Sequence, residues 1–176
     1  MYFCSISRLY FRRDNFIIAI ENISKSFSDQ NVLKNISFSV KQGDALAIIG
    51  KSGIGKSVLL KHLNGLITPD SGKVIIDDQK INNMRFKKLE KIRSNISMVF
   101  QFGALFDSMT VYENISLGLE KMTSLNKNEI SDRIFETLEE VGMEGSENRY
   151  PSDLSGGMKK RVGIARAIAV KPKYLL

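Results

Sequence analysis

One glycine-rich stretch, GKSGIGKS, carries the most recognisable chemistry in this sequence. It matches a pattern of glycine, four free positions, glycine, lysine and serine or threonine that binds polyphosphates. Gly50, Gly53 and Gly55 permit a tight turn whose N–H groups converge on an anion. Lys56 is expected to reach the β- and γ-phosphates of a nucleotide, and the Ser57 hydroxyl to bind Mg²⁺. The predicted contact set is the whole loop: Gly50, Lys51, Ser52, Gly53, Ile54, Gly55, Lys56 and Ser57.

The segments on either side of this loop are of the types that a phosphate site needs. Ala45 to Ile49 is a short apolar run, which we interpret as a buried strand. After the loop, apolar residues recur at helical spacing, so that the positive end of a helix would face the phosphates. These helical positions are Val58, Leu59, Leu60, Leu63 and Leu66.

Length and composition favour one globular domain. The chain has 176 residues, of which 43% are hydrophobic and 26% charged. No apolar run approaches the ~18 residues of a membrane-spanning helix. The net charge is +7, but the basic residues are spread out and no basic patch is studded with aromatic residues. We therefore expect a basic surface near a membrane and no nucleic-acid partner.

The first 16 residues are expected to form a poorly ordered extension. They contain Arg8, Arg12 and Arg13 among aromatic residues but no uninterrupted apolar core, which argues against a secretory signal. The single cysteine, Cys4, excludes an intramolecular disulfide and fits a reducing compartment.

From Phe16 to Val40 the sequence alternates as strands do, with polar turns between the runs, and predicts an antiparallel β layer before the phosphate loop. Phe27 stands where the chain turns, either as a core residue or as a ligand contact. After a turn at Thr68 to Gly72, residues 73–78 end in two aspartates. We interpret Asp77-Asp78-Gln79 as a hairpin turn and reject a magnesium-binding strand there.

Ile96 to Phe100 is predicted to be a strand that delivers Gln101 to its end, as an ordinary loop residue or as a group that touches Mg²⁺ or orients water. Thr110 to Glu113 resembles a helix-capping box. Ser155, Gly156 and Gly157 precede another helix and make a second anion-receptive N-terminus. Further helix positions are Ile130, Ile134, Leu138 and Val141 in one stripe and Val162, Ala165, Ile168 and Ala169 in another.

With these residues assembled, the sequence resembles the ATP-binding subunit of ATP-binding-cassette (ABC) transporters over residues 17–176. GKSGIGKS corresponds to the Walker A loop, Gln101 to the Q-loop, and LSGGM at 154–158 to the signature motif LSGGQ. The resemblance implies an α/β P-loop NTPase fold with a RecA-like core, an antiparallel β layer and an inserted helical subdomain. It also implies that Phe27 stacks on adenine.

Within this resemblance, residues 17–101 form the β layer and P-loop core, 102–165 the helical subdomain, and 166–176 the return to the core. The family's cofactors are ATP and Mg²⁺. Two subunits would sandwich ATP between the Walker A loop of one and the signature of the other, as a homodimer. Closure would move a membrane permease, contacted through the segment after Gln101. The expected location is peripheral, at the cytoplasmic face of a bacterial inner membrane.

Three features resemble a narrower group, the ATPases of Mce-type lipid transporters, which include the Mla phospholipid system. They are Met158, the VLLK that follows Ser57, and the phrase FQFGALFDS at 100–108. This resemblance implies Mce-type lipid-binding and small regulatory subunits as partners. Neither the cargo nor the direction of transport is readable from these residues.

The sequence departs from the family pattern at its end. Tyr174 to Leu176 resembles the start of the Walker B strand, but the magnesium-binding aspartate, catalytic glutamate and switch histidine do not follow, and His62 is only a helix-surface or packing residue. We therefore expect no Mg²⁺-ATPase activity from residues 1–176 alone. Two alternatives to an incomplete transporter subunit remain: a remnant of a split gene and a soluble ABC ATPase without a permease. The DNA beyond codon 176 separates the first of these from an incomplete chain.

Overall fold

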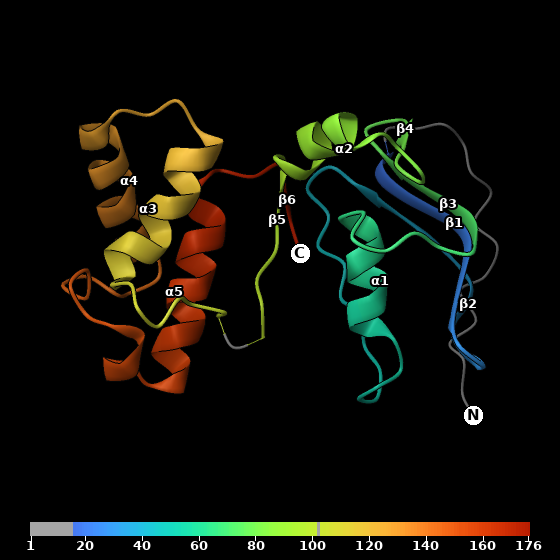
Figure 1. The fold of residues 1–176 in the computed structure, drawn as a ribbon, viewed down its shortest axis with the longest axis horizontal. Helices are drawn as coiled ribbons and strands as arrows, with labels where there is room; N and C mark the ends of the chain where they lie inside the picture. Colours follow the sequence, from blue (N-terminus) through green and yellow to red (C-terminus); the bar gives the residue numbers. More distant parts are fainter. Residues whose placement is uncertain (1–15, 102) are drawn as a thin grey trace. The chain divides into compact units, whose positions relative to one another are not determined.

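The computed structural model describes residues 16–101 and 103–176. The described residues form two compact units, one up to residue 89 and one from residue 90, which are coloured from blue to green and from green to red in Figure 1. The predicted N-terminal extension lies outside the described residues, apart from Phe16, and so do Cys4 and Phe102. Among the described residues, no helix combines the length and the apolar character needed to cross a membrane.

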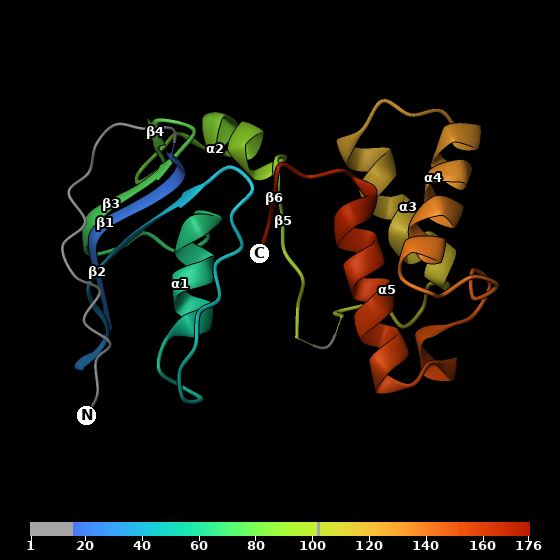
Figure 2. The same ribbon diagram turned by 180° about the vertical axis from the view of Figure 1, so that it is seen from behind.

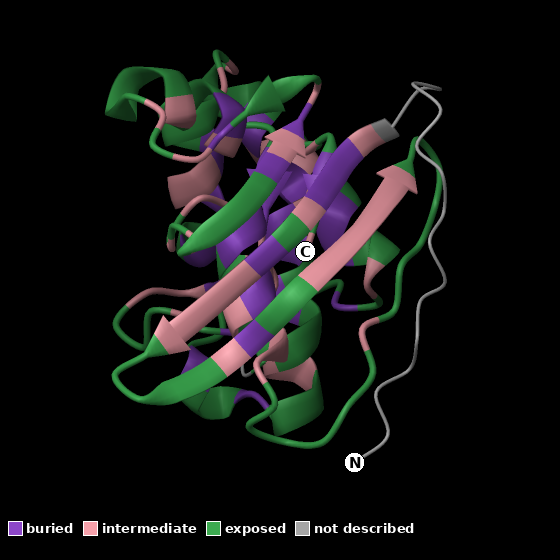
Figure 3. Cartoon of the chain, turned by 90° about the vertical axis from the view of Figure 1, so that its right-hand side faces the viewer, coloured by how far each residue is buried: buried purple, intermediate pink, exposed green. Residues whose placement is uncertain are grey.

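The first unit is built on an antiparallel sheet, as predicted. Its strands are β1 (Phe16–Phe27), β2 (Gln30–Lys41), β3 (Ser71–Ile76) and β4 (Gln79–Lys80), in the order β2-β1-β3-β4. The inner strand β1 has consecutive buried residues at 18–20 and becomes more exposed toward its C-terminal end (Figure 3). Ile18, Ile20 and Ile76 are buried, and Ile18 faces Ile76 across the ladder. The buried side chains of the sheet therefore gather where β1 pairs with β3.

The turn between β3 and β4 confirms the predicted hairpin. Asp77 and Asp78 both have positive φ angles, 48° and 60°, which are the angles of a type I′ turn. Ile76 and Gln79 pair across it. A two-residue turn of this type holds the ladder in register, so these aspartates serve the hairpin.

Helix α1 (Lys56–Leu63) and helix α2 (Phe86–Arg93) complete the described elements of this part of the chain. On α1 the buried residues are Leu59, His62 and Leu63, so the predicted helical stripe is confirmed as far as Leu63. Leu66 lies beyond the helix and is exposed. His62 is a packing residue, as one of the two sequence interpretations had it.

The predicted strand at Ala45 to Ile49 is wrong. These residues form neither helix nor strand, and Leu46 and Ile49 are 52% and 93% exposed. A strand exists only where a neighbouring strand accepts its hydrogen bonds, and no strand of the described residues pairs with this segment. Apolar composition alone does not supply a pairing partner.

Three helices dominate the second unit: α3 (Val111–Met122), α4 (Lys127–Glu140) and α5 (Gly156–Ala169). A short 3₁₀ helix, η1 (Pro151–Asp153), precedes α5. Figures 1 and 2 show α3, α4 and α5 side by side. The predicted capping box is present, since the Thr110 side chain accepts from the N–H of Glu113 and the Glu113 carboxylate accepts from the N–H of Thr110. Asn126 and Glu129 cap α4 in the same way.

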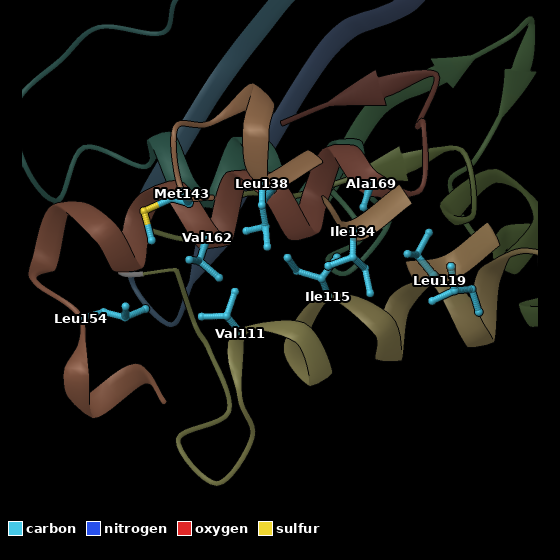
Figure 4. Packing of buried hydrophobic residues seen from close by; sticks show 11 residues of the cluster. Val111, Ile115, Leu119, Ile134, Leu138, Met143, Leu154, Val162 and Ala169 are labelled. Carbon is cyan, nitrogen blue, oxygen red and sulfur yellow. The ribbon is translucent and has the colours of Figure 1, made fainter. Parts of the chain in front are cut away.

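The three helices bury one apolar cluster between them (Figure 4). Val111 and Ile115 of α3 lie opposite Val162 of α5 and Ile134 and Leu138 of α4, and all five side chains are fully buried. The predicted stripe of α4 is therefore confirmed as the packed face of that helix. Val141, also predicted in this stripe, is partly buried and packs against the cluster.

Two short strands join the ends of this unit. β5 (Ile96–Ser97) and β6 (Tyr174–Leu175) run parallel, with Ile96 opposite Tyr174. The strand expected at Ile96 to Phe100 is thus present but shorter, although the Val99 N–H still donates to the Leu176 carbonyl at 2.8 Å. The strand expected at 174–176 is present at Tyr174–Leu175.

Candidate nucleotide-binding site

The glycine-rich loop leads directly into α1, whose first residue is Lys56. The Lys56 ammonium donates to the backbone carbonyls of Gly50 and Lys51, both at 2.7 Å. The loop is thereby folded around its own lysine. An ammonium has three donors, so this arrangement leaves one for a ligand at the same point.

Gly55 is required at the junction between loop and helix. It caps α1 with a φ of 104°, and a Cβ at this position would lie 2.7 Å from Cγ1 of Val32. Gly53 also has a positive φ, 79°. Glycine reaches such angles without steric cost. Positive φ angles that alternate with ordinary ones curl successive N–H groups toward one centre and form an anion-binding concavity.

The loop's own amides fit a phosphate ligand. Among the described residues, none accepts a hydrogen bond from the backbone N–H groups of residues 51–55. The loop is mostly exposed, and the N-terminus of α1 adds partial positive charge. Free donors, a cation and a helix start together make a site for an anion of high charge density.

Ser57 lies in the first turn of α1 and is exposed, so its hydroxyl is accessible to a magnesium ion carried by a nucleotide. Within residues 16–101 and 103–176, no cluster of three or more histidine, cysteine, aspartate or glutamate residues could hold a metal. A hydroxyl and phosphate oxygens are typical magnesium ligands.

Phe27 ends β1 and is 44% exposed, which leaves an aromatic face open to a flat ligand. The Lys25 ammonium lies 5.5 Å from the centre of its ring. Phe27 pairs with Gln30 at the tip of the β1–β2 hairpin, and Val32 of the same hairpin is the residue that lines Gly55. The β1–β2 hairpin therefore carries the aromatic residue at its tip and lies next to the glycine loop at Val32.

The second unit holds the remaining sequence-predicted residues. Ser155 caps α5 and its hydroxyl accepts from the N–H of Met158 at 3.3 Å. Gly156 and Gly157 are exposed in the first turn, and a Cβ on Gly156 would meet nothing within 4 Å. These glycines leave space against the helix N-terminus, where the backbone of another molecule can approach closely.

Gln101 is exposed and occupies a turn beyond β5. The N–H of Gly103 donates to the carbonyl of Phe100 at 2.9 Å and closes this turn. Gln101 also lines a cleft of about 550 Å³ with Asp107 and Lys159. Its side chain is therefore available to a ligand or to water.

Residues 33–176 match the family model described as ABC transporter. The chain belongs to this family. The glycine loop and the sequence at 154–158 both lie within the matched residues. The fold agrees, since a dimeric ATP-binding cassette, solved in a post-hydrolysis state bound to ADP and Pi, is similar with a TM-score of 0.82 and 34% identity. That match covers 90% of this chain and 72% of the other. The chain is thus a P-loop NTPase of the ABC type, as its sequence predicted.

Curated relatives of this ABC chain are similar over most of its length. Methionine import ATP-binding protein MetN 2 of Bacillus licheniformis is 45% identical over 164 residues, 91% of this chain. Protein TRIGALACTOSYLDIACYLGLYCEROL 3, chloroplastic, of Arabidopsis thaliana is 39% identical over 176 residues. The chain spans about half of their length, 48% in each case. The narrower expectation of an Mce-type lipid transporter is not supported by these comparisons, in which methionine import proteins predominate.

Sequence reasoning missed two residues of this ABC domain that hold the backbone beside the predicted contact residues. Asp70 pairs with Lys25 at 2.6 Å and accepts from the N–H of Ser26 at 2.7 Å, so it braces the strand end that carries Phe27. Arg166 binds the backbone after Gln101. Gly163, inside α5, was a signal that another backbone segment lies close to this helix. Glycine is unfavourable in a helix interior, so its presence there calls for such a reason.

Proposed function

We propose that this chain is the nucleotide-binding part of an ABC transporter ATPase subunit and binds MgATP through its Walker A loop. The observation that supports this best is the loop itself. Its N–H groups at 51–55 have no acceptor among the described residues, and the Lys56 ammonium at the start of α1 is held by the carbonyls of Gly50 and Lys51. A triphosphate offers acceptor oxygens for all of these donors. Charge-assisted hydrogen bonds of this kind are about twice as strong as neutral ones.

Each side chain has a role in this proposal. Lys56 holds the β- and γ-phosphates, Ser57 contributes its hydroxyl to the magnesium ion, and Phe27 stacks on the base. When bound, Mg²⁺ neutralises part of the phosphate charge. Gln101 positions water or contacts the ion. The loop residues Gly50, Lys51, Ser52, Gly53, Ile54 and Gly55 supply backbone donors.

The proposal also includes a second copy of the chain. Ser155, Gly156 and Gly157 present a helix N-terminus that would contact the γ-phosphate of the ATP bound by the partner. Support comes from the exposure of these residues and from the dimeric state of the similar cassette. ATP would then hold the dimer closed, and loss of the γ-phosphate would release it.

The permease would dock on a groove of about 470 Å³ in the second unit. Phe100 and Phe106 lie at this groove and are 48% and 51% exposed, and Met122 is 44% exposed. Large apolar side chains left exposed around one groove indicate a protein contact. This location includes the segment after Gln101, as the family resemblance implied, and the subunit would then lie at the inner face of a membrane.

The cargo is the least constrained part of the proposal. The names of the relatives favour methionine import, and one relative is named for a galactolipid. We propose import of methionine as the first candidate and a polar lipid as the second. Uptake of labelled methionine by cells with and without the gene would decide. Unchanged methionine uptake together with altered membrane lipid composition would favour the lipid candidate.

Binding of a non-hydrolysable ATP analogue to the purified chain tests the core of the proposal. Lys56→Ala should weaken binding by roughly tenfold or more, because each hydrogen bond from a charged group contributes about 1.5–3 kcal/mol. Lys61→Ala, on the exposed side of the same helix, is the matched control and should bind normally. Equal affinity of the wild type and the Lys56 variant would contradict the proposal.

A further inference from the structure

A single arginine of α5 is hydrogen-bonded to the backbone that follows Gln101. Arg166 donates from Nη1 to the carbonyl of Ala104 at 2.9 Å and from Nη2 to the carbonyl of Gly103 at 2.7 Å. The two acceptors are 62 and 63 positions away in the sequence. Among the described residues, no carboxylate forms an ion pair with Arg166. Its fork of donors is therefore committed to these two carbonyls.

Two glycines allow the same stretch of backbone to lie in direct contact with α5. A Cβ on Gly163 would lie 2.7 Å from Cα of Gly103. A Cβ on Gly103 would lie 2.5 Å from the carbonyl oxygen of Lys159. Both distances are shorter than real Cβ contacts, so only glycine fits at either position. The approach of turn and helix is thus a backbone-to-backbone contact.

We call these contacts, the Arg166 hydrogen bonds and the approach of Gly103 to Gly163, the clamp. The backbone that the clamp holds has an unusual conformation. Gly103 and Ala104 have successive positive φ angles of 78° and 46°. For alanine this region costs about 1–2 kcal/mol, so outside interactions must hold it. The Arg166 fork and the glycine contact supply them. Because the Gly103 N–H also closes the turn onto Phe100, the position of Gln101 depends on this clamp.

Helix α5 links this clamp to the signature motif. It begins at Gly156, next to its cap Ser155, and runs without a break through Gly163 and Arg166 to Ala169. A continuous helix transmits a displacement along its axis. The signature glycines lie at the start of α5, and the turn that carries Gln101 is bound further along the same helix.

We propose that Arg166 is a positioning residue that fixes the Gln101 turn to the signature helix, so that the two groups move together. This inference rests on the proposed function, in which Gln101 contacts one nucleotide and the signature of the same subunit contacts the other. Arg166 then couples the two sites: a nucleotide that draws the signature inward also shifts Gln101. Closure of one site is transmitted to its neighbour through three hydrogen-bonded residues, Arg166, Gly103 and Ala104.

Hydrogen exchange of the nucleotide-free chain tests the clamp by itself. In Arg166→Lys the charge is kept but the two-pronged geometry is lost, so the Gly103 amide should exchange roughly tenfold faster. Arg161→Lys is the matched control: Arg161 is on the same helix and donates to the carbonyl of Gly142 at 3.2 Å, far from the turn in sequence. It should leave Gly103 unchanged.

Exchange of the α4 amides (Lys127–Glu140) reports whether each variant is folded and should be the same in all the proteins compared. Gly163→Ala provides an independent disruption, since its added methyl collides with Gly103, and should accelerate exchange at Gly103 as Arg166→Lys does. Unchanged Gly103 exchange in both Arg166→Lys and Gly163→Ala, with α4 intact, would overturn the clamp.

Addition of a non-hydrolysable ATP analogue with Mg²⁺ tests the coupling. In the wild type the analogue should protect residues 50–57 and slow the exchange of Gly103. In Arg166→Lys it should bind with similar affinity and protect 50–57 while Gly103 no longer responds, a split that general loss of stability would not produce. Equal Gly103 responses in the two proteins would overturn the coupling. Absence of protection at 50–57 in the wild type would instead refute the proposed function, and the nucleotide-free comparison would still decide the clamp.

Discussion

The ammonium of Lys25 lies 2.6 Å from the carboxylate of Asp70, which also accepts the N–H of Ser26. The hydrogen bond from Lys25 is the main reason that the pKa of Asp70 is below its usual value, and the N–H of Ser26 lowers it further. This pair anchors the end of β1 immediately before Phe27. Any stabilisation that it contributes is present above pH 3.8, the ordinary value, and is lost as the pH falls through the lowered pKa.

Asp70→Asn should therefore weaken binding of an ATP analogue modestly, by about two- to threefold, because an ion pair with an exposed carboxylate contributes little. The effect should shrink at high salt, where exposed charges are screened. Titration by intrinsic or analogue fluorescence at two salt concentrations measures it. Asp29→Asn, at the exposed tip of the same hairpin, is the control. A larger loss in the Asp29 variant would show that Phe27 is not positioned through Asp70.

Gly55→Ala should destabilise the chain more than Gly53→Ala. Both positions have positive φ, so both variants carry about 1–2 kcal/mol of backbone strain. Only at Gly55 does the new methyl also collide with Val32, whereas Gly53 has open space around it. Urea unfolding of the two variants gives the difference directly. Equal destabilisation would mean that the loop can move away from β2 without cost.

Buried His62 should make the stability depend on pH. Burial is the main cause that lowers its pKa below 6.5, against the opposing hydrogen bond to the carbonyl of Val58; the charge of Lys25 lowers it further and that of Asp70 raises it. Among the described residues Nε2 has no hydrogen-bond partner. The unfolded chain thus binds the proton more tightly, and stability should fall as the pH drops below about 6.5 toward the lowered pKa.

His62→Leu removes this titration and is the direct comparison. The free energy of unfolding of the wild type, measured from pH 8 to pH 5, should decline relative to that of the variant over the same range. Above pH 7 the difference between the two proteins should be constant. A constant difference down to pH 5 would show that His62 is not protonated on unfolding.

Ser155 has a structural and a proposed functional role that two substitutions separate. Ser155→Ala removes the α5 cap and should cost about 1 kcal/mol of stability. Ser155→Asp keeps a capping oxygen, so it should unfold like the wild type. Its negative charge, however, would repel a partner's γ-phosphate, and ATP-dependent dimerisation should fail. Light scattering with an ATP analogue checks this, and normal dimerisation of the Asp variant would remove the signature from the nucleotide site.

Local features of the fold were predictable because they depend on neighbours in the sequence. The Thr110–Glu113 box, the Asp77-Asp78 turn and the stripe of α4 each involve residues within a few positions of one another, where residue type fixes hydrogen bonding or burial. The loop at 50–57 belongs to the same class. The glycine spacing already specifies its curvature and its helix start.

Features that depend on distant segments were not predictable in this way. The contact of Gly103 with Gly163 joins parts of the chain that share no local pattern, and Arg166 had no acidic neighbour to suggest a role. The strand expected at Ala45 to Ile49 failed for the same reason, since a strand needs a partner that periodicity does not reveal. The roles assigned to Phe27 and Gln101 stay predictions until nucleotide contacts are measured.

The run Ala45 to Ile49, which pairs with no strand of the described residues, has a practical consequence. Its backbone is open to pairing and its Ile49 side chain is almost wholly accessible, which is the combination that nucleates self-association. Solutions of this chain should become turbid with increasing concentration, and dilute samples should keep longest. Replacing Ile49 with lysine would be the first choice for making material that survives storage.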